Sequence, residues 1–176
     1  LLTKKNKKII AVDIVDNILK RKNLEKINFE TIIKPHAIFN FIKKNKTKIN
    51  AVIHMGAISS TAESNIDLLF ENNLNYSKKL FETCNKFSIK LIYASSAATY
   101  GDGSHGFKDT NSFLEFIKLT PSNLYGLSKH LFDLFILEQI SNKKNVPCKP
   151  VGLKFFNVYG PNEQHKGFMM SPIPKF

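Results

Sequence analysis

Short apolar runs recur along the chain and predict buried strands. Four of them are Ile9–Val12, Ala51–His54, Leu91–Ala94 and Val151–Phe155, and Phe29–Ile33 is a weaker candidate. Such runs are too short for helices, and polar or glycine residues follow them, as is usual where a strand of a parallel sheet ends. The pattern therefore predicts strands that are covered on both faces.

Between the strands, apolar residues spaced three or four positions apart predict helices. One begins at Pro35 and carries lysines at its carboxyl end, a second covers residues 64–87, and a third covers Tyr125–Ile140. Strands that alternate with helices predict an α/β fold with a doubly wound, Rossmann-like parallel sheet, which binds ligands at the carboxyl ends of its strands. We also expect the chain to lack the first β–α unit of such a fold, because Leu1 is not a methionine and residues 1–8 resemble the end of an earlier element.

Composition places the chain among globular proteins and limits its partners. Apolar residues make up 43% of it, the mean hydropathy is −0.18, and no apolar run approaches the roughly 18 residues of a membrane span. The two cysteines, Cys84 and Cys148, lack the spacing of a metal site, which favours reduced thiols. We therefore expect a cytoplasmic protein with neither a metal site nor a membrane partner.

A net charge of +12 raises the alternative of nucleic-acid binding. Residues 1–50 alone hold 13 Lys and Arg against 4 Asp and Glu. However, Arg21 is the sole arginine, whereas bidentate recognition of guanine favours arginine. The basic residues are scattered among Asn and Ile, so a compositional bias explains them as well, and we expect no nucleic-acid partner.

Three residues form a candidate proton relay. Ser96 follows the apolar run at Leu91–Ala94, and about 30 residues later Tyr125 and Lys129 open a predicted helix. Residues four apart share one face of a helix, so both side chains address the same site. A lysine ammonium beside a phenol favours the phenolate and makes it a better general base. The Tyr-x-x-x-Lys spacing alone is weak, and the serine at a strand end gives the pattern its weight.

Other strand ends carry residues suited to a dinucleotide. Asp13 ends the run Ile9–Val12, which would be the second strand of a complete dinucleotide-binding fold, where an acid binds ribose hydroxyls. Gly56 follows His54, where glycine permits close approach of a ligand. We expect His54 itself to be a structural core residue. Asn72 and Asn73 lie inside the helix predicted over 64–87, where asparagine is a poor helix former, so either one faces a cofactor or both lie on the surface.

Several motifs resemble a known family. Tyr-Ala-Ser-Ser-Ala-Ala-Thr-Tyr-Gly at 93–101, Tyr-Gly-Leu-Ser-Lys at 125–129 and Phe-Phe-Asn-Val-Tyr-Gly-Pro-Asn-Glu at 155–163 resemble the extended short-chain dehydrogenase/reductase family of nucleotide-sugar epimerases and dehydratases. More narrowly, His54–Thr61, Glu71–Ser77 and His165-Lys166-Gly167 are similar to the ADP-L-glycero-D-manno-heptose 6-epimerases. The resemblance runs from about Ile9 to Met170 and is strongest from Ala51 onward.

The resemblance implies an isomerase that inverts C6″ of an ADP-heptose by transient oxidation and re-reduction, for the heptose of the lipopolysaccharide core. It implies bound NADP, with NAD as the alternative. Tyr125 and Lys166 would be the acid/base residues, Lys129 would anchor the cofactor ribose and tune the phenol, and Ser96 would bond the reacting oxygen. The implied cofactor-binding residues are Asp13, Lys20, Met55, Gly56, Ala57, Ile58, Ser59, Asn72, Asn73, Lys129 and Val158. The implied substrate contacts are Ser96, Asn157 and Phe168.

The resemblance also implies a domain organisation and an oligomeric state. A partial NAD(P)-binding Rossmann domain would cover residues 1–160, and residues 161–176 would begin a truncated substrate-binding region. A homo-oligomer, by resemblance a pentamer, is expected at full length. Two departures are Phe168, where the family tends to have a smaller or polar residue, and Lys154, where it tends to have arginine. The alternatives are another nucleotide-sugar epimerase or dehydratase, such as a UDP-sugar 4-epimerase, and a non-catalytic cofactor-binding protein, which would not need the Ser96, Tyr125 and Lys129 set.

Overall fold

The computed structural model describes residues 8–15, 17–25, 27, 29–142, 145–171 and 173. The chain divides into two compact units. The first consists of Leu1–Lys44 with Asn157–Phe176, and the second consists of Asn45–Phe156.

The first unit is built around a pair of short parallel strands. β1 (Ile10–Val12) pairs with β2 (Thr31–Ile33), and α1 (Ile18–Glu25) connects them. β2 is shorter than the predicted strand at Phe29–Ile33. A 3-10 turn at Pro35–Ala37 leads into α2 (Ile38–Asn45), whose Ile38 and Ile42 are buried as the apolar spacing predicts. The unit also contains the 3-10 segment η5 (Gln164–Met169), which contacts α1.

The second unit holds a three-stranded parallel sheet in the order β3-β4-β5. The strands are β3 (Ala51–His54), β4 (Lys90–Ser96) and β5 (Val151–Phe155), close to the predicted bounds. Ile53 pairs with Ile92, and Tyr93 with Gly152. Every described strand pair is parallel, which confirms the predicted α/β class.

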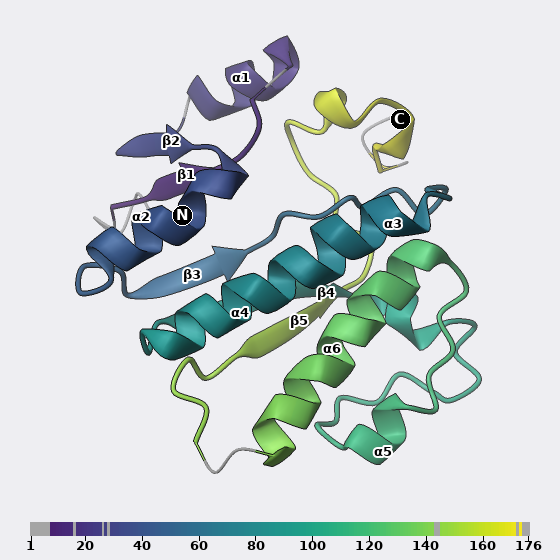
Figure 1. Cartoon of the computed structure of the whole chain (residues 1–176). Helices are drawn as coiled ribbons and strands as arrows, with labels where there is room; N and C mark the ends of the chain where they lie inside the picture. Colours follow the sequence, from purple (N-terminus) through teal and green to yellow (C-terminus); the bar gives the residue numbers. More distant parts are fainter. Residues whose placement is uncertain are drawn as a thin grey trace. The chain divides into compact units, whose positions relative to one another are not determined.

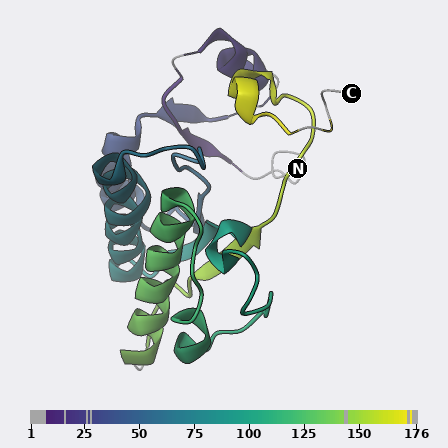
Figure 2. The ribbon, with the colours of Figure 1, turned by 90° about the vertical axis from the view of Figure 1, so that its right-hand side faces the viewer.

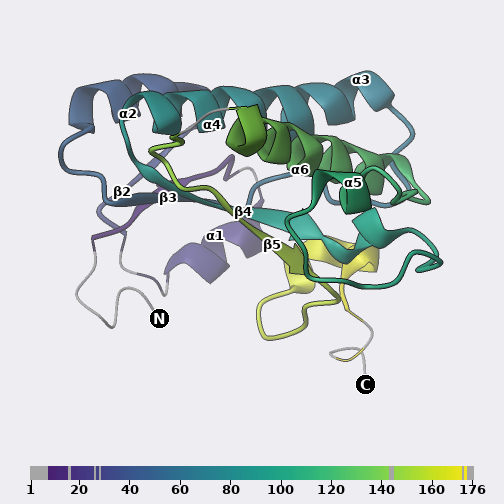
Figure 3. The same ribbon diagram turned by 90° about the horizontal axis from the view of Figure 1, so that it is seen from below.

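Two long helices cover one face of this sheet. α4 (Tyr76–Lys86) and α6 (Leu124–Asn142) lie side by side over it, as Figures 1 and 3 show, and the short α5 (Phe113–Phe116) packs against α6, which Figure 2 shows from the side. The core between helices and sheet contains Phe81, Leu91 and Phe132, each at most 2% exposed. Phe132 meets the Tyr93 ring edge-on, with 4.8 Å between the ring centroids.

The helix predicted over 64–87 contains a π-helical turn. It runs as α3 (Ile66–Leu69), the π turn η3 (Phe70–Asn75) and α4, and Asn65 caps its start by accepting a 3.0 Å hydrogen bond from Leu68 N. A π turn inserts one residue into the helix and often marks a functional position. It contains both asparagines of the prediction, and it buries Asn73 completely.

Candidate active site

Tyr125 and Lys129 lie on the first turns of α6, close to the end of β4. The turn that starts α6 is held by Asn123, whose Oδ1 accepts a 2.7 Å hydrogen bond from Gly126 N. Gly126 packs directly on the turn after β4, because a Cβ built on it would lie 2.7 Å from the backbone oxygen of Ala98. This glycine therefore lets the helix that carries Tyr125 approach the strand end that carries Ser96.

Ser96 is buried at the end of β4 and caps the 3-10 turn η4 (Ala97–Tyr100). Its Oγ accepts a 3.1 Å hydrogen bond from Ala98 N, which leaves its hydroxyl hydrogen available to another acceptor. Thr99 Oγ1 donates a 2.8 Å hydrogen bond to Ser96 O and fixes the backbone of the turn. The predicted serine is thus rigidly placed next to the start of α6.

Lys129 is a buried cation. It is 4% exposed, and its side-chain ammonium makes no hydrogen bond with the described residues. Burial lowers the pKa of Lys129 to about 8, while the nearby Asp133 carboxylate acts in the opposite direction. An ammonium without partners in a buried place is suited to a ligand that accepts hydrogen bonds.

The turn after β3 is tied to α6 through Asn73. Asn73 Oδ1 accepts a 2.9 Å bond from Ile58 N, and its Nδ2 donates to Ile58 O (2.9 Å) and to Ser128 Oγ (3.0 Å). Ser128 in turn donates a 2.7 Å bond to Tyr125 O. Asn73 therefore fixes the predicted cofactor turn, and all its side-chain hydrogen-bonding groups are used within the chain. By contrast, Asn72 is exposed and donates to Leu68 O.

The turn that Asn73 holds is open on its outer side. Met55, Gly56, Ala57 and Ser59 are exposed, and Ile58 is half-buried. A Cβ built on Gly56 would meet no atom of the chain within 4 Å. The backbone at the carboxyl end of β3 is thus free to be approached closely by a ligand.

His54 is a neutral core residue, as expected. Ser77 Oγ donates a 2.6 Å bond to Asn73 O, so the 2.8 Å contact between His54 Nε2 and Ser77 Oγ has the imidazole as the donor. Burial, assisted by the charge of Lys129, lowers the pKa of His54 to about 4. The histidine therefore holds Ser77, which in turn bonds the backbone oxygen of Asn73.

The remaining predicted residues belong to the first unit. Asp13 and Lys20 form a 2.8 Å ion pair, and Asp13 also accepts a 2.6 Å bond from Ile14 N. Asn157 and Val158 are exposed. The backbone of Phe168 lies in η5, but its side chain is outside the part of the chain that the structure describes.

Lys166 is held in a turn organised by Glu163. The Glu163 carboxylate is 6% exposed and accepts hydrogen bonds from Gly160 N (2.6 Å) and Ser171 N (3.0 Å), and Lys166 Nζ lies 3.4 Å from it. The Ser171 bond foremost, with the Gly160 bond and the Lys166 charge, lowers the pKa of Glu163 against the effect of burial. Glu163 thus stays ionised and restrains the predicted second base.

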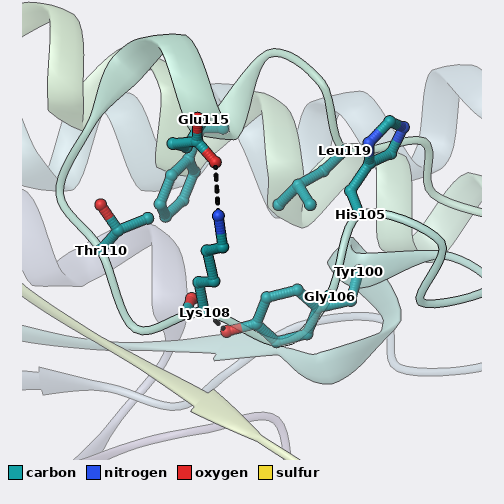
Figure 4. A pocket seen from close by; sticks show the side chains of 8 residues that line it. Tyr100, His105, Gly106, Lys108, Thr110, Glu115 and Leu119 are labelled. Atoms are coloured by element: carbon teal, nitrogen blue, oxygen red, sulfur yellow. Dashed lines mark hydrogen bonds and ion pairs between the residues drawn. The ribbon is translucent and has the colours of Figure 1, made fainter.

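A small pocket lies beside η4 but is no substrate site. Tyr100, Lys108 and Glu115 are among its lining residues, Lys108 and Glu115 form a 3.4 Å ion pair across it, and Tyr100 OH donates to Lys108 O (Figure 4). Its free space suits about one water molecule. A sugar nucleotide does not fit there.

Sequence reasoning missed the residues that support the site. Asp133 and Lys154 form a 2.9 Å ion pair, and both side chains are largely buried. The Lys154 ammonium also lies over the rings of Phe116 and Tyr100, 4.7 and 5.0 Å from their centroids. Asp133 was detectable, because it follows Lys129 by four residues and therefore lies on the same face of the helix.

Comparison with known proteins identifies the family. The model of the NAD dependent epimerase/dehydratase family matches residues 1–176. The chain belongs to that family. Within it, the chain is 52% identical over 131 residues to an ADP-L-glycero-D-manno-heptose-6-epimerase of Fusobacterium nucleatum, covering 74% of this chain and 38% of the relative. It is 42% identical over 169 residues to the enzyme of that name from Nitratidesulfovibrio vulgaris, covering 95% and 50%.

Solved structures of family members agree with the fold. The Helicobacter pylori ADP-L-glycero-D-manno-heptose-6-epimerase matches with a TM-score of 0.70 at 28% identity, covering 96% of this chain and 52% of that chain. The UDP-Glc/GlcNAc 4-epimerase of Campylobacter jejuni matches with a TM-score of 0.71 at 25% identity, covering 97% and 52%. The chain thus spans about half the length, or less, of the relatives that it matches. None of the described helices is long and apolar enough to cross a membrane.

Proposed function

We propose that the protein containing this chain is an ADP-L-glycero-D-manno-heptose 6-epimerase. The observation that carries the proposal is the 42% identity, over 95% of the chain, to a relative of that name. The arrangement of Ser96, Tyr125 and Lys129 at the carboxyl end of the β3-β4-β5 sheet supports it, because ligands of open α/β sheets bind at that end.

A nicotinamide cofactor fits the residues of the second unit. The open backbone at Gly56 and the unbonded ammonium of Lys129 are suited to a nucleotide and its ribose hydroxyls. The Met55–Ser59 turn, which Asn73 fixes from inside the chain, and Lys129 would hold it, with Asp13, Lys20, Asn72 and Val158 as further contacts. When bound, it would supply a reversible hydride acceptor at C6″.

The acid–base steps fall to the chain's own residues. Tyr125 would take the proton of the C6″ hydroxyl while a hydride leaves C6″, which gives a transient ketone. Ser96 would donate a hydrogen bond to the reacting oxygen and stabilise charge on it. Lys129 would anchor the cofactor ribose beside Tyr125, and Asn157 and Phe168 would contact the sugar.

Lys166 would serve the opposite face of the ketone. Return of the hydride to that face needs a proton on the oxygen, which the Lys166 ammonium would donate, and solvent would restore both protonation states. Glu163 would orient the Lys166 side chain through their 3.4 Å contact. Two acid/base groups would let each epimer be deprotonated without a large turn of the sugar.

We propose a preference for NADP over NAD, which the pairing of Asp13 with Lys20 supports. A free carboxylate at the end of β1 would repel a 2′-phosphate, but Lys20 already pairs with Asp13 at 2.8 Å and offsets its charge. A Lys20→Ala variant should lose affinity for NADP more than for NAD. We further propose a cytoplasmic homo-oligomer, with a domain boundary at residues 160/161.

The full-length protein should interconvert the two C6″ epimers of ADP-heptose. Tyr125→Phe and Lys166→Ala should each slow the reaction by about 10²-fold or more, since each removes an acid/base group. Both variants should still bind NADPH, and Lys90→Ala, at an exposed lysine on β4, should keep the native rate. Wild-type rates in both site variants would refute the assignment.

The main rival is a UDP-sugar 4-epimerase, because the chain is also similar to the UDP-Glc/GlcNAc 4-epimerase of Campylobacter jejuni. Turnover of UDP-glucose, with none of ADP-heptose, would favour that rival. Absence of turnover with either sugar, combined with tight NADPH binding, would favour a non-catalytic cofactor-binding protein.

A further inference from the structure

A buried polar cluster lies next to Lys129 and takes no part in the steps above. Its centre is Asp133, which is 3% exposed and follows Lys129 by one turn of α6. The Asp133 carboxylate accepts hydrogen bonds from Tyr93 OH (3.0 Å), Ser95 Oγ (2.6 Å) and Lys154 Nζ (2.9 Å). A carboxylate buried this deeply persists as an anion only with such partners around it.

The cluster joins α6 to the strand end that carries Ser96. Lys154, on β5, donates from Nζ to Thr99 Oγ1 (2.5 Å) as well as to Asp133. Thr99 then donates to Ser96 O. An unbroken chain of hydrogen bonds thus runs from the helix of Tyr125 and Lys129, through β5, to the backbone of Ser96.

The same carboxylate acts on Lys129 by charge. Lys129 and Asp133 are four residues apart on one helix face, and both are nearly inaccessible to water. Burial favours the neutral amine at Lys129, and Asp133 opposes that effect and raises the pKa of Lys129. Without Asp133, the Lys129 proton would be held less tightly.

We propose that Asp133 is a positioning residue that acts through Lys129, keeping its ammonium charged while its hydrogen bonds hold the Ser96 strand end against α6. Lys154 donates a hydrogen bond to the carboxylate and extends its hold to Thr99. The proposal rests on the proposed function for the statement that a charged Lys129 serves the cofactor and Tyr125.

Other titratable groups lie on α6 and on neighbouring elements, and the charge of Lys129 acts on one of them, His54. They are His54 on β3, Tyr76 at the start of α4, Tyr93 on β4, Lys154 on β5, and Tyr125 and His130 on α6. Burial lowers the pKa of His54 to about 4 and also lowers the pKa of His130, and it raises the pKa values of Tyr76 and Tyr93. These four groups therefore stay uncharged near pH 8, where Lys129 titrates.

The test is the titration of Lys129 itself. Lysine labelled with ¹⁵N at Nζ would be followed by NMR between pH 6 and 11, with the Lys129 signal assigned by its loss in Lys129→Met. In the native chain the midpoint should be about 8. In Asp133→Asn, which removes the charge at nearly constant shape, it should fall by about one pH unit or more.

The sign of the change separates the proposed role from a merely structural one. If Asp133 only held the fold together, its loss would admit water to Lys129 and raise the midpoint, because hydration stabilises the ammonium. A raised or unchanged midpoint would therefore overturn the proposal. Glu138→Gln makes the same chemical change at an exposed acid of α6 and should leave the midpoint where it is.

Asp133→Asn leaves Lys154 as an unpaired buried cation and is at risk of unfolding. The double variant Asp133→Asn/Lys154→Met removes both charges and should fold, and its Lys129 midpoint should also fall. Lys154→Met alone keeps the carboxylate, so its midpoint should not fall. An equal fall in Lys154→Met and Asp133→Asn would contradict a specific role for the carboxylate.

Activity then separates this inference from the proposed function. In the full-length protein, Asp133→Asn should shift the alkaline limb of the pH–rate profile for ADP-heptose to lower pH by the same amount as the NMR midpoint. Asp133→Glu should restore part of that shift. A moved NMR midpoint with an unmoved limb would refute the role given to Lys129, and an unmoved midpoint would refute the role given to Asp133.

Discussion

Asn73 Nδ2 donates a 3.0 Å hydrogen bond to Ser128 Oγ, which connects the π turn of one helix to the helix of Tyr125 and Lys129. The same amide also bonds both backbone groups of Ile58. One fully buried side chain therefore sets the distance between the turn after β3 and the start of α6. Both the cofactor site and the proton relay depend on this distance.

Replacing Asn73 should be costly, whereas replacing its neighbour should not. Asn73→Ala leaves the N–H and C=O of Ile58 without their hydrogen-bond partner, so it should lower the free energy of unfolding by about 2–4 kcal/mol. Asn72→Ala loses one exposed bond to Leu68 O and gains helix propensity, so its effect should stay within about 0.5 kcal/mol. Urea unfolding of the two variants measures the difference. Equal stabilities would contradict the bridging role of Asn73.

Gly126 should not tolerate even one added methyl group. In an open helix, Gly→Ala gains about 1 kcal/mol from propensity, but a Cβ at Gly126 would lie 2.7 Å from Ala98 O, a backbone atom that cannot easily move. Overpacking of this kind costs about 1–3 kcal/mol, so we expect net destabilisation of Gly126→Ala. Gly160→Ala, whose Cβ meets nothing within 4 Å, is the control for urea unfolding. A Gly126→Ala variant as stable as the wild type would show that α6 can move away from η4.

His54 should make the protein sensitive to acid. Its pKa is about 4 in the folded chain and 6.5 in the reference state, so the unfolded chain binds more protons between these values. The stability supplied by neutral His54 is therefore present above pH 6.5 and is lost as the pH falls to 4, by about 2–3 kcal/mol. His54→Gln should flatten the pH dependence of unfolding in this window.

The control for that experiment is His36→Gln, at an exposed histidine. It should leave the slope of unfolding free energy against pH as in the wild type. Histidine NMR gives an independent measurement, because Lys129→Met should raise the His54 midpoint above 4 by removing a nearby positive charge. An unmoved midpoint would contradict the electrostatic coupling of the two residues.

The strands and long helices were predictable because their burial leaves a strong apolar pattern. β3, β4 and β5 begin and end within a residue or two of the apolar runs, and α6 extends the predicted helix by one residue at its start and two at its end. α1 was missed because three of its eight residues are Lys or Arg and none of its described side chains is buried, so it has no buried apolar stripe to detect. The four-residue α5 is too short for a period to appear.

The candidate site was predictable as a set of residue types but not as a network. Ser96, Tyr125 and Lys129 stand out by spacing, and the structure brings their elements together. Asn72 and Asn73 are identical in type and adjacent in sequence, and the π turn alone decides that the second is buried. Lys154 lies on a strand whose neighbours are apolar, and its partnership with Asp133 depends on tertiary packing that no local pattern reveals.

The π turn also fixes the number of residues that this helix segment needs. Deleting one residue from Phe70–Asn75 would restore regular α-helix and remove the turn that buries Asn73, while the helical segments on either side would keep their relative orientation. Leu69, 1% exposed before the turn, and Phe81, 1% exposed after it, would still face the same core, but Asn73 would lose its buried place. The segment should consequently accept many exchanges of side chain but very few changes in length, so homologues aligned through it without a gap preserve the placement of Asn73.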